Sequence, residues 1–209
     1  MCKTMCKTMN KTLIKKSKRL SWLLRHGASE VGLDMDEAGW VEVGAVLRAM
    51  NMSLGDLEWV VAGNDKRRLQ LEAGRVRACQ GHSLDNLAVT REGLEASWAV
   101  YADEAPVWHG TSVEAVPGIA REGIRAVART HVHLAPSMTS KVGKRASVQV
   151  MLEVSPARVR AAGLELYGAP NGVVLAREIP ASAVVGLHPI SKRAHAQAAV
   201  LRGLFEAIA

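Results

Sequence analysis

The chain has 209 residues, 48% of them hydrophobic and 22% charged, which is typical of a globular protein and excludes a wholly disordered one. Its formal net charge of +7 favours an anionic partner such as RNA, DNA or a nucleotide. No apolar run of about eighteen residues predicts a membrane-spanning helix, and the first residues lack the apolar core of a signal peptide. Cys2, Cys6 and Cys79 are too few and too scattered for a disulfide framework, so we expect a cytoplasmic protein with no membrane partner.

The N-terminal region is strongly basic. Residues 1–12 read MCKT-MCKT-MNKT, a short repeat without apolar periodicity, and we expect a flexible tail there. Such a basic stretch is either a solvated arm or a segment that attracts phosphate groups, and the residues alone favour neither. The basic residues among the first 25, where no acidic residue occurs, are Lys3, Lys7, Lys11, Lys15, Lys16, Lys18, Arg19 and Arg25.

Residues 13–95 show the pattern of three helices followed by a hairpin. The predicted elements are a helix from Leu13, helices over Val43–Met50 and Leu54–Ala62, the latter capped by Ser53, and strands over Arg68–Glu72 and Arg75–Ala78. Gly39-Trp40 is predicted to form a turn before the second helix. This order is the outline of a winged helix, which is frequent among nucleic-acid-binding proteins, although a fold alone does not establish a function.

Residues 81–106 are predicted to link this lobe to a second one, and we place the domain boundary between residues 95 and 96. Short apolar runs alternate with short helical patterns in residues 96–209, which favours a compact α+β lobe. The expected strands lie at Val107-Trp108, Val132–Leu134, Val148–Val154 and Val173–Leu175, and the expected helices at Ser112–Glu122 and Pro156–Ala162. The chain has neither GxGxxG nor a P-loop, which argues against a Rossmann or Walker site.

The stretch SWLLRHG, which ends at Gly27, allows two interpretations. Gly27 has the form of a helix C-cap, and Arg25 and His26 would then be cations facing the negative end of the helix dipole. Alternatively, this helix end presents a fixed charge and a titratable ring to a ligand. The local sequence does not decide between them.

Three further stretches could carry chemistry: NDKRRLQL at 64–71, VWHGTS at 107–112 and HVHLAPSMTSKVGKR at 131–145. Each has a structural alternative, such as exposed strand ends for Arg67 and Arg68 or a half-buried core histidine for His109. His131 and His133 would share one face of a strand. A zinc site needs a third ligand, and no carboxylate lies at ligand-like spacing, so we assign no metal site.

Taken together and in this order, these stretches resemble the RNA 2'-phosphotransferase (KptA) family, from about Lys15 to about Pro189. The matching segments are LSWLLRHG, GW at 39–40, NDKRRLQL, RACQGHS at 77–83, WHGTS, HVHLA, VGKR and LYGAPNGVVLAREIP at 166–180. The resemblance implies an α+β protein of two lobes, an N-terminal winged helix and a C-terminal NAD-binding lobe of the ADP-ribosyltransferase type. We expect it to be a monomer.

The resemblance also implies a reaction, in which an internal RNA 2'-phosphate, such as one on a tRNA-like splice product, is transferred to NAD as co-substrate. The family's site is an Arg-His pair with two further arginines, which correspond to Arg25, His26, Arg68 and Arg145. Arginine forks bind two phosphate oxygens and stay charged, and several of them stabilise charge that develops at phosphorus. His26 can donate or accept a proton in the second step. The site would lie in a cleft between the lobes.

By the same resemblance, His109, Gly110 and Thr111 hold NAD, with Ser112 and residues 80–83 as weaker candidates. His131 and His133 flank this pocket, and either could take the place of a tyrosine that stacks on nicotinamide in related transferases. The chain departs from the family pattern at Leu69, where an aromatic residue is usual, and at Ala135, where a serine is usual. Ala146-Ser147 likewise replaces a more polar pair.

Two other functions remain open. One keeps the NAD lobe but transfers ADP-ribose to a terminal phosphate of RNA or DNA. The other is a basic winged-helix binding protein whose second lobe is structural, and the presence of all four residues of the family's site argues against it.

Overall fold

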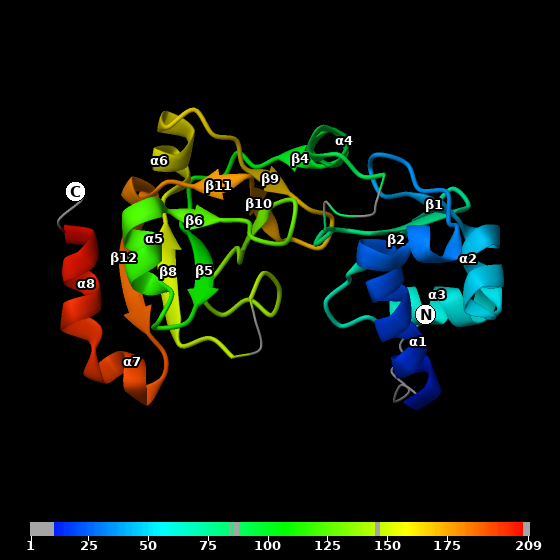
Figure 1. Cartoon of the computed structure of the whole chain (residues 1–209), viewed down its shortest axis with the longest axis horizontal. Coiled ribbons are helices and arrows are strands. Elements are labelled where there is room, and N and C mark those ends of the chain that lie inside the picture. Colours follow the sequence, from blue (N-terminus) through cyan, green and yellow to red (C-terminus); the bar gives the residue numbers. More distant parts are fainter. Residues whose placement is uncertain (1–10, 84, 86–87, 145–146, 207–209) are drawn as a thin grey trace, which may run out of the picture. The chain divides into compact units, whose positions relative to one another are not determined.

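A computed structural model describes residues 11–83, 85, 88–144 and 147–206 of the chain (Figure 1). It divides into two compact units, one that ends at Ser97 and one that begins at Trp98. Both units combine helices with small antiparallel sheets, which confirms the predicted α+β class.

The first unit begins with helices and ends with a small sheet and one further helix. Its elements are α1 (Lys11–Trp22), the π-helical turn η1 (Leu23–Gly27), the 3-10 turn η2 (Ser29–Val31), β1 (Val41–Glu42), α2 (Val43–Met50), α3 (Leu54–Ala62), β2 (Leu69–Glu72), β3 (Arg75–Ala78) and α4 (Arg91–Ala96). The helix predicted from Leu13 already includes Lys11 and Thr12, so these two residues do not belong to a flexible tail. Residues 1–10 of the predicted tail lie outside the described residues.

The predicted helices and hairpin of this unit are confirmed, and local signals explain them. The side chain of Ser53 accepts a hydrogen bond from the backbone of Asp56 at 3.1 Å, which caps α3. Ala73 and Gly74 join β2 to β3 with φ of 47° and 76°, the left-handed pair that a two-residue hairpin turn requires. The strand order is β1-β3-β2, and α1 packs against α3 through its buried face (Figure 1).

A buried arginine holds the hairpin to the rest of this unit. Arg77 is 3% exposed, and its guanidinium lies over the ring of Trp40, 4.5 Å from the centroid. Its Nε donates to Gln70 Oε1 at 2.9 Å and its Nη1 donates to Ser97 Oγ at 2.7 Å. Burial lowers the pKa of Arg77 from its usual value, and these contacts keep the charge solvated by protein dipoles.

The segment 81–106, predicted as a link, contains short elements of secondary structure among its described residues. The boundary between the units falls inside it, but α4 forms on one side and a strand at Ala99–Val100 on the other. Thr90 caps α4 by accepting a hydrogen bond from the backbone of Gly93 at 2.9 Å, and Leu94 is buried. A capping residue and one apolar anchor therefore suffice to form a six-residue helix within the predicted link.

The second unit contains most of the strands. Its elements are β4 (Ala99–Val100), β5 (Val107–Thr111), α5 (Val116–Glu122), β6 (Ile124–Arg125), β7 (Val132–Leu134), β8 (Val150–Val154), α6 (Pro156–Ala161), β9 (Tyr167–Gly168), β10 (Val174–Ala176), β11 (Glu178–Ile179), the 3-10 turn η3 (Ala181–Ala183), β12 (Val184–Pro189), α7 (Lys192–Ala196) and α8 (Ala198–Glu206). The predicted strand at Val132–Leu134 is confirmed, and the other predicted elements are found with shifted ends.

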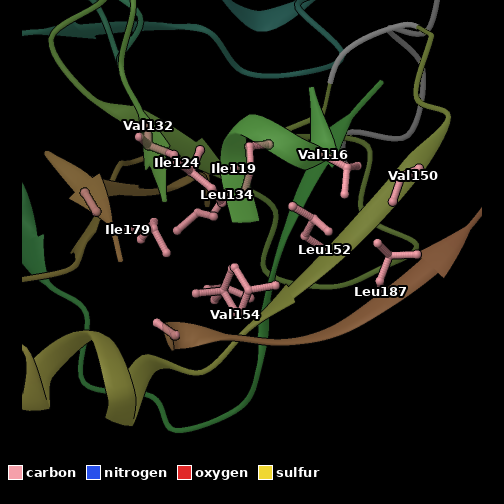
Figure 2. Close-up of a cluster of buried hydrophobic side chains, with 14 of the residues drawn as sticks. Val116, Ile119, Ile124, Val132, Leu134, Val150, Leu152, Val154, Ile179 and Leu187 are labelled. Atoms are coloured by element: carbon pink, nitrogen blue, oxygen red, sulfur yellow. The ribbon is translucent and has the colours of Figure 1, made fainter. Parts of the chain in front are cut away.

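Two antiparallel sheets organise this unit, in the orders β12-β8-β5 and β4-β9-β10-β7. They meet where the backbones of Trp108 and Ala135 exchange hydrogen bonds of 2.9 and 2.7 Å. Valine and leucine side chains from both sheets and from α5 form one core, and Figure 2 shows Leu152, Val154 and Leu134 within it. The unit is thus held mainly by apolar burial between strands.

The register places a histidine at the end of this core. Leu152 pairs with Leu187 on one side and with His109 on the other, so the three side chains share one face of the sheet. Leu152 and Leu187 are buried, whereas His109 is only half-buried. The strand therefore carries His109 from the edge of the core toward the junction of the two sheets.

Candidate active site

The Arg25-His26 pair lies on a widened helical turn rather than at a helix end. Helix α1 continues into the π-helical turn η1, and Ala28 after it is still right-handed, with φ of −59° and ψ of −42°. The left-handed residue that ends this helical segment is Gly32, with φ of 66°. Of the two interpretations of this stretch, the one in which Gly27 is a left-handed C-cap is therefore excluded.

Position 27 requires glycine because the ring of Trp22 leaves no room for a side chain there. A Cβ atom on Gly27 would lie 2.4 Å from Cζ3 of Trp22, so any larger residue would displace the indole ring. Leu23 and Leu24 are buried beneath the turn, which leaves Arg25 and His26 half-buried. A π-helical turn carries an extra residue, and such turns are frequent at functional sites.

Ser83 fixes this turn from the loop that follows the hairpin. Its backbone N–H donates to the carbonyl of Arg25 at 3.1 Å, and its Oγ lies 3.4 Å from Nδ1 of His26. The same hydroxyl lies within 3.3 Å of the carbonyls of Arg25 and Asp85, to either of which it can donate. A hydroxyl both donates and accepts, so Ser83 can serve His26 in either protonation state.

Arg68 is positioned by a turn built on Asn64. The buried Oδ1 of Asn64 accepts hydrogen bonds from the backbones of Lys66 and Arg68, both at 3.3 Å, and its carbonyl accepts from Arg67 at 2.8 Å. Arg67 takes up a left-handed conformation with φ of 42°. This turn delivers Arg68 to the first position before β2, with its side chain 35% exposed and 3.9 Å from Asp65.

Residues 79–83 bring Arg25, His26 and Arg68 to the same end of the hairpin. The backbone of Cys79 donates to the carbonyl of Arg68 at 2.8 Å, just as Ser83 donates to Arg25. Burial raises the pKa of the Cys79 thiol to about 11, and the positive charges of Arg77 and Arg25 oppose that rise. The fourth predicted member, Arg145, lies outside the described residues.

In the second unit, His109 is held in one tautomer. Its Nδ1 lies 3.1 Å from the carbonyl oxygen of His133, which can only accept, so Nδ1 carries a proton. The Nε2 atom is then the acceptor of a neutral ring. The pairing of β5 with the chain around Ala135 sets this geometry.

Gly110, Thr111 and Ser112 are held by the segment that leads into β8. A Cβ on Gly110 would lie 2.6 Å from Cγ2 of Val148, so this glycine is required by packing. The carbonyl of Thr111 accepts from the backbone of Gln149 at 3.0 Å. Ser112 hydrogen-bonds to Glu114, and this bond, after one from the backbone of Glu114 itself, lowers the pKa of that carboxyl.

His131, just before β7, and His133, within it, have different environments. His131 is 2% exposed and packs edge-on against Trp98, with ring centroids 5.0 Å apart. Nη1 of Arg129 donates a hydrogen bond to Nδ1 of His133 at 2.7 Å, so the ring of His133 carries its hydrogen on Nε2. His133 thus presents its carbonyl to His109 and its ring to Arg129.

Other possible sites are separate from these residues. Among residues 11–83, 85, 88–144 and 147–206, no cluster of three histidine, cysteine or acidic side chains is placed to hold a metal ion. No helix in the described part of the chain is long and apolar enough to cross a membrane. A cavity of about 520 Å³ in the second unit is lined by Glu153, His188, Arg202 and Phe205 among others, and by none of the predicted site residues.

Comparison with known proteins identifies the family. The model of the RNA 2'-phosphotransferase, Tpt1 / KptA family matches residues 11–178. A probable RNA 2'-phosphotransferase of Streptomyces coelicolor is 35% identical over 174 residues, covering 80% of this chain and 91% of the relative. One of Pseudomonas fluorescens is 36% identical over 180 residues, covering 82% and 95%. A tRNA 2'-phosphotransferase 1 of Danio rerio is 33% identical over 175 residues, covering 78% and 77%.

Proposed function

This chain belongs to the RNA 2'-phosphotransferase, Tpt1 / KptA family, and from that premise we propose that it removes an internal 2'-phosphate from RNA by transferring it to NAD. The observation that carries the proposal is the gathering of Arg25, His26 and Arg68 at one end of the hairpin, on a family match that covers all three. The products are RNA with a 2'-hydroxyl, nicotinamide and ADP-ribose 1'',2''-cyclic phosphate.

The two units have separate tasks in this proposal. The first, with three helices followed by a hairpin, acts as a winged helix that binds RNA, and the second acts as an ADP-ribosyltransferase-type unit that binds NAD. The order of elements in the first unit and the paired small sheets of the second support this assignment. The protein acts as a monomer in the cytoplasm.

In the first step, an oxygen of the RNA 2'-phosphate attacks the anomeric carbon of the nicotinamide ribose, and nicotinamide leaves with the electrons of the broken bond. An RNA-2'-phospho-ADP-ribose intermediate results. Arg25 and Arg68 hold the phosphate oxygens and set the line of attack, because guanidinium groups bind them bidentately and remain charged. Arg145, by its place in VGKR, contributes a further charge.

In the second step, the ribose 2''-hydroxyl attacks the phosphorus, closes the cyclic phosphate and expels the RNA 2'-oxygen. The attacking hydroxyl loses a proton and the leaving oxygen gains one. His26 exchanges one of these protons, since its ring is half-buried and hydrogen-bonded to a hydroxyl that accommodates both protonation states. The arginines stabilise the negative charge that builds up on the phosphoryl oxygens.

His109, Gly110 and Thr111 hold the co-substrate in this proposal. The Nδ1–H of His109 is committed to the carbonyl of His133, so its Nε2 faces NAD as a hydrogen-bond acceptor. The close approach of Gly110 to Val148 keeps β5 flat against the neighbouring chain. His131 and His133 support this end of β5, and Ser112 contributes less because it bonds to Glu114.

The test uses a short RNA with one internal 2'-phosphate, incubated with the protein with and without NAD, followed by separation of the RNA and nucleotide products. We expect loss of the phosphate only with NAD, together with ADP-ribose cyclic phosphate in equal amount. A stable ADP-ribosylated RNA would contradict the second step and favour ADP-ribosyl transfer to nucleic-acid phosphates. RNA binding without any turnover would overturn the enzyme assignment.

A further inference from the structure

One face of α1 is exposed from Lys15 to Trp22, and three of its residues are cationic. Lys15, Lys18, Arg19 and Trp22 follow one another at spacings of three and four residues, so they lie side by side on the helix surface. The opposite face carries Ser17 and Leu20, which are buried at 6% and 0% exposure. Helix α1 therefore packs with one face and presents the other to solvent.

The charge of this face has no partner among the residues that the structure describes. Within the described part of the chain, Lys15, Lys18 and Arg19 take part in no hydrogen bond or ion pair, whereas the neighbouring Lys16 binds Asp56 at 2.6 Å. No acidic residue occurs in α1 itself. Three adjacent cations without internal counter-charges are suited to an external polyanion.

An exposed indole continues the cationic row. Trp22 is 46% exposed, and its six-membered ring lies against Gly27, which leaves no room for a side chain at that position. Burial of one ring surface fixes the orientation of the indole, and the remaining surface is available for contact. Arg25 follows Trp22 by three residues, so the row ends beside the π-helical turn that carries Arg25 and His26.

We propose that this α1 face, formed by Lys15, Lys18, Arg19 and Trp22, binds the single-stranded RNA next to the nucleotide that carries the 2'-phosphate, with Trp22 stacked on one base. The proposal rests on the proposed function, because it places the phosphate at Arg25 and His26. The cations track the phosphodiester backbone, and the indole offers a flat surface to an unpaired base. Stacking of this kind tolerates any base, so the surface positions RNA without reading its sequence.

A double-mutant cycle tests the stacking. Binding of a fluorescent single-stranded RNA with one internal 2'-phosphate is measured without NAD for the wild type and for Trp22→Leu, and again with RNAs made abasic at each neighbouring position. We expect Trp22→Leu to weaken binding about tenfold on intact RNA and to have no effect on the RNA that is abasic at the stacked position. Trp22→Phe should restore most of the affinity.

The cations are tested by salt dependence. RNA affinity falls as salt rises, and the triple variant Lys15→Gln, Lys18→Gln, Arg19→Gln should make this dependence shallower. The magnitude of the slope of log affinity against log salt should decrease by about 2, since each phosphate contact in a single strand contributes roughly 0.7. A matched control removes three exposed cations elsewhere, with Arg48→Gln, Arg125→Gln and Lys192→Gln, and should leave the slope unchanged. Equal effects of both triples would overturn the proposal, because the charge effect would then be nonspecific.

Failure of this inference and failure of the proposed function give different results. If Trp22→Leu folds, as its thermal unfolding shows, and loses equal affinity for intact and all abasic RNAs, the stacking is overturned while NAD-dependent phosphate removal stands. If the coupling to one base is found but no phosphate is removed with NAD, the RNA surface is supported and the proposed reaction is overturned.

Discussion

His26 in the first unit and His109 in the second are both half-buried and both hydrogen-bonded through Nδ1, but their partners differ in kind. His26 faces the hydroxyl of Ser83, which can donate or accept. His109 faces the carbonyl of His133, which can only accept. Nδ1 of His26 can therefore either donate to or accept from its partner, whereas Nδ1 of His109 can only donate.

This difference fits the two proposed roles, proton transfer for His26 and ligand binding for His109. A general acid or base must take up and release a proton within each turnover, and a partner that serves both states lowers the cost of doing so. A ring that positions a ligand instead benefits from a partner that fixes which nitrogen donates and which accepts. The predictions below test this division, in order from the largest expected effect.

Arg68→Ala should lower kcat by about 10² to 10³-fold, because one charge that stabilises the phosphoryl oxygens is lost. The apparent KM for NAD should change little, since NAD is assigned to the other unit. Steady-state kinetics with the 2'-phosphate RNA measures both. Arg67→Ala, in the same turn and equally charged, is the control and should retain most activity; similar losses in both variants would contradict the assignment of Arg68.

His26→Ala should slow the second step by about a hundredfold and the first step much less, because proton transfer is needed mainly when the ribose hydroxyl attacks. RNA-2'-phospho-ADP-ribose should then accumulate in a single-turnover experiment and be visible on a denaturing gel. Ser83→Ala should have a smaller effect. If His26→Ala instead slows the first step without accumulating this species, His26 does not have the proposed role.

Gly27→Ala should lower the free energy of unfolding by about 2 kcal/mol, since the new methyl group overlaps the indole of Trp22. Replacing Trp22 by alanine should remove most of this penalty, so the two changes should not be additive in denaturant titrations. Gly32→Ala is the comparison: it has open space around it but a left-handed backbone, and should cost about 1 kcal/mol whatever residue stands at 22. Full additivity of Gly27→Ala and Trp22→Ala would argue against the steric explanation.

His109→Ala should raise the apparent KM for NAD about tenfold with a smaller change in kcat, because one oriented hydrogen bond to the co-substrate is lost. His188→Ala is a suitable control. His188 lies on β12 in the same sheet as His109, but it packs against Trp108 on the face of the sheet opposite to His109. An unchanged KM in His109→Ala would remove His109 from the NAD site.

The parts of the fold with strong local signals were predictable. Ala73-Gly74 between two alternating runs specifies a tight hairpin, and Ser53 marks the start of α3. Strand β12 was missed, although it contributes Leu187 to the core, because a bulge between Val184 and Gly186 breaks the alternation. Two-residue strands such as β6 and β11 have no period that a sequence can show, and only their partners define them.

The sequence offered candidate residues for the site, but it could not predict their geometry. Resemblance pointed to Arg25, His26 and Arg68, and an Asn-centred turn before Arg68 is an expected use of Asn64. The role of Ser83 could not be deduced, because it acts on His26 across 57 residues of sequence. Gly27 was misread for a related reason: its constraint comes from the ring of Trp22, and a glycine in sequence does not reveal whether it serves conformation or space.

The buried guanidinium of Arg77 has a consequence for the order in which the chain can fold during synthesis. One of its hydrogen-bond partners, Ser97, is made 20 residues later than Arg77 itself. A charge withdrawn from water before its partners exist costs several kcal/mol, so the base of the hairpin must remain hydrated until Ser97 has emerged. We therefore expect the surroundings of Arg77 to close only after Ser97, the last residue of the first unit, has been made.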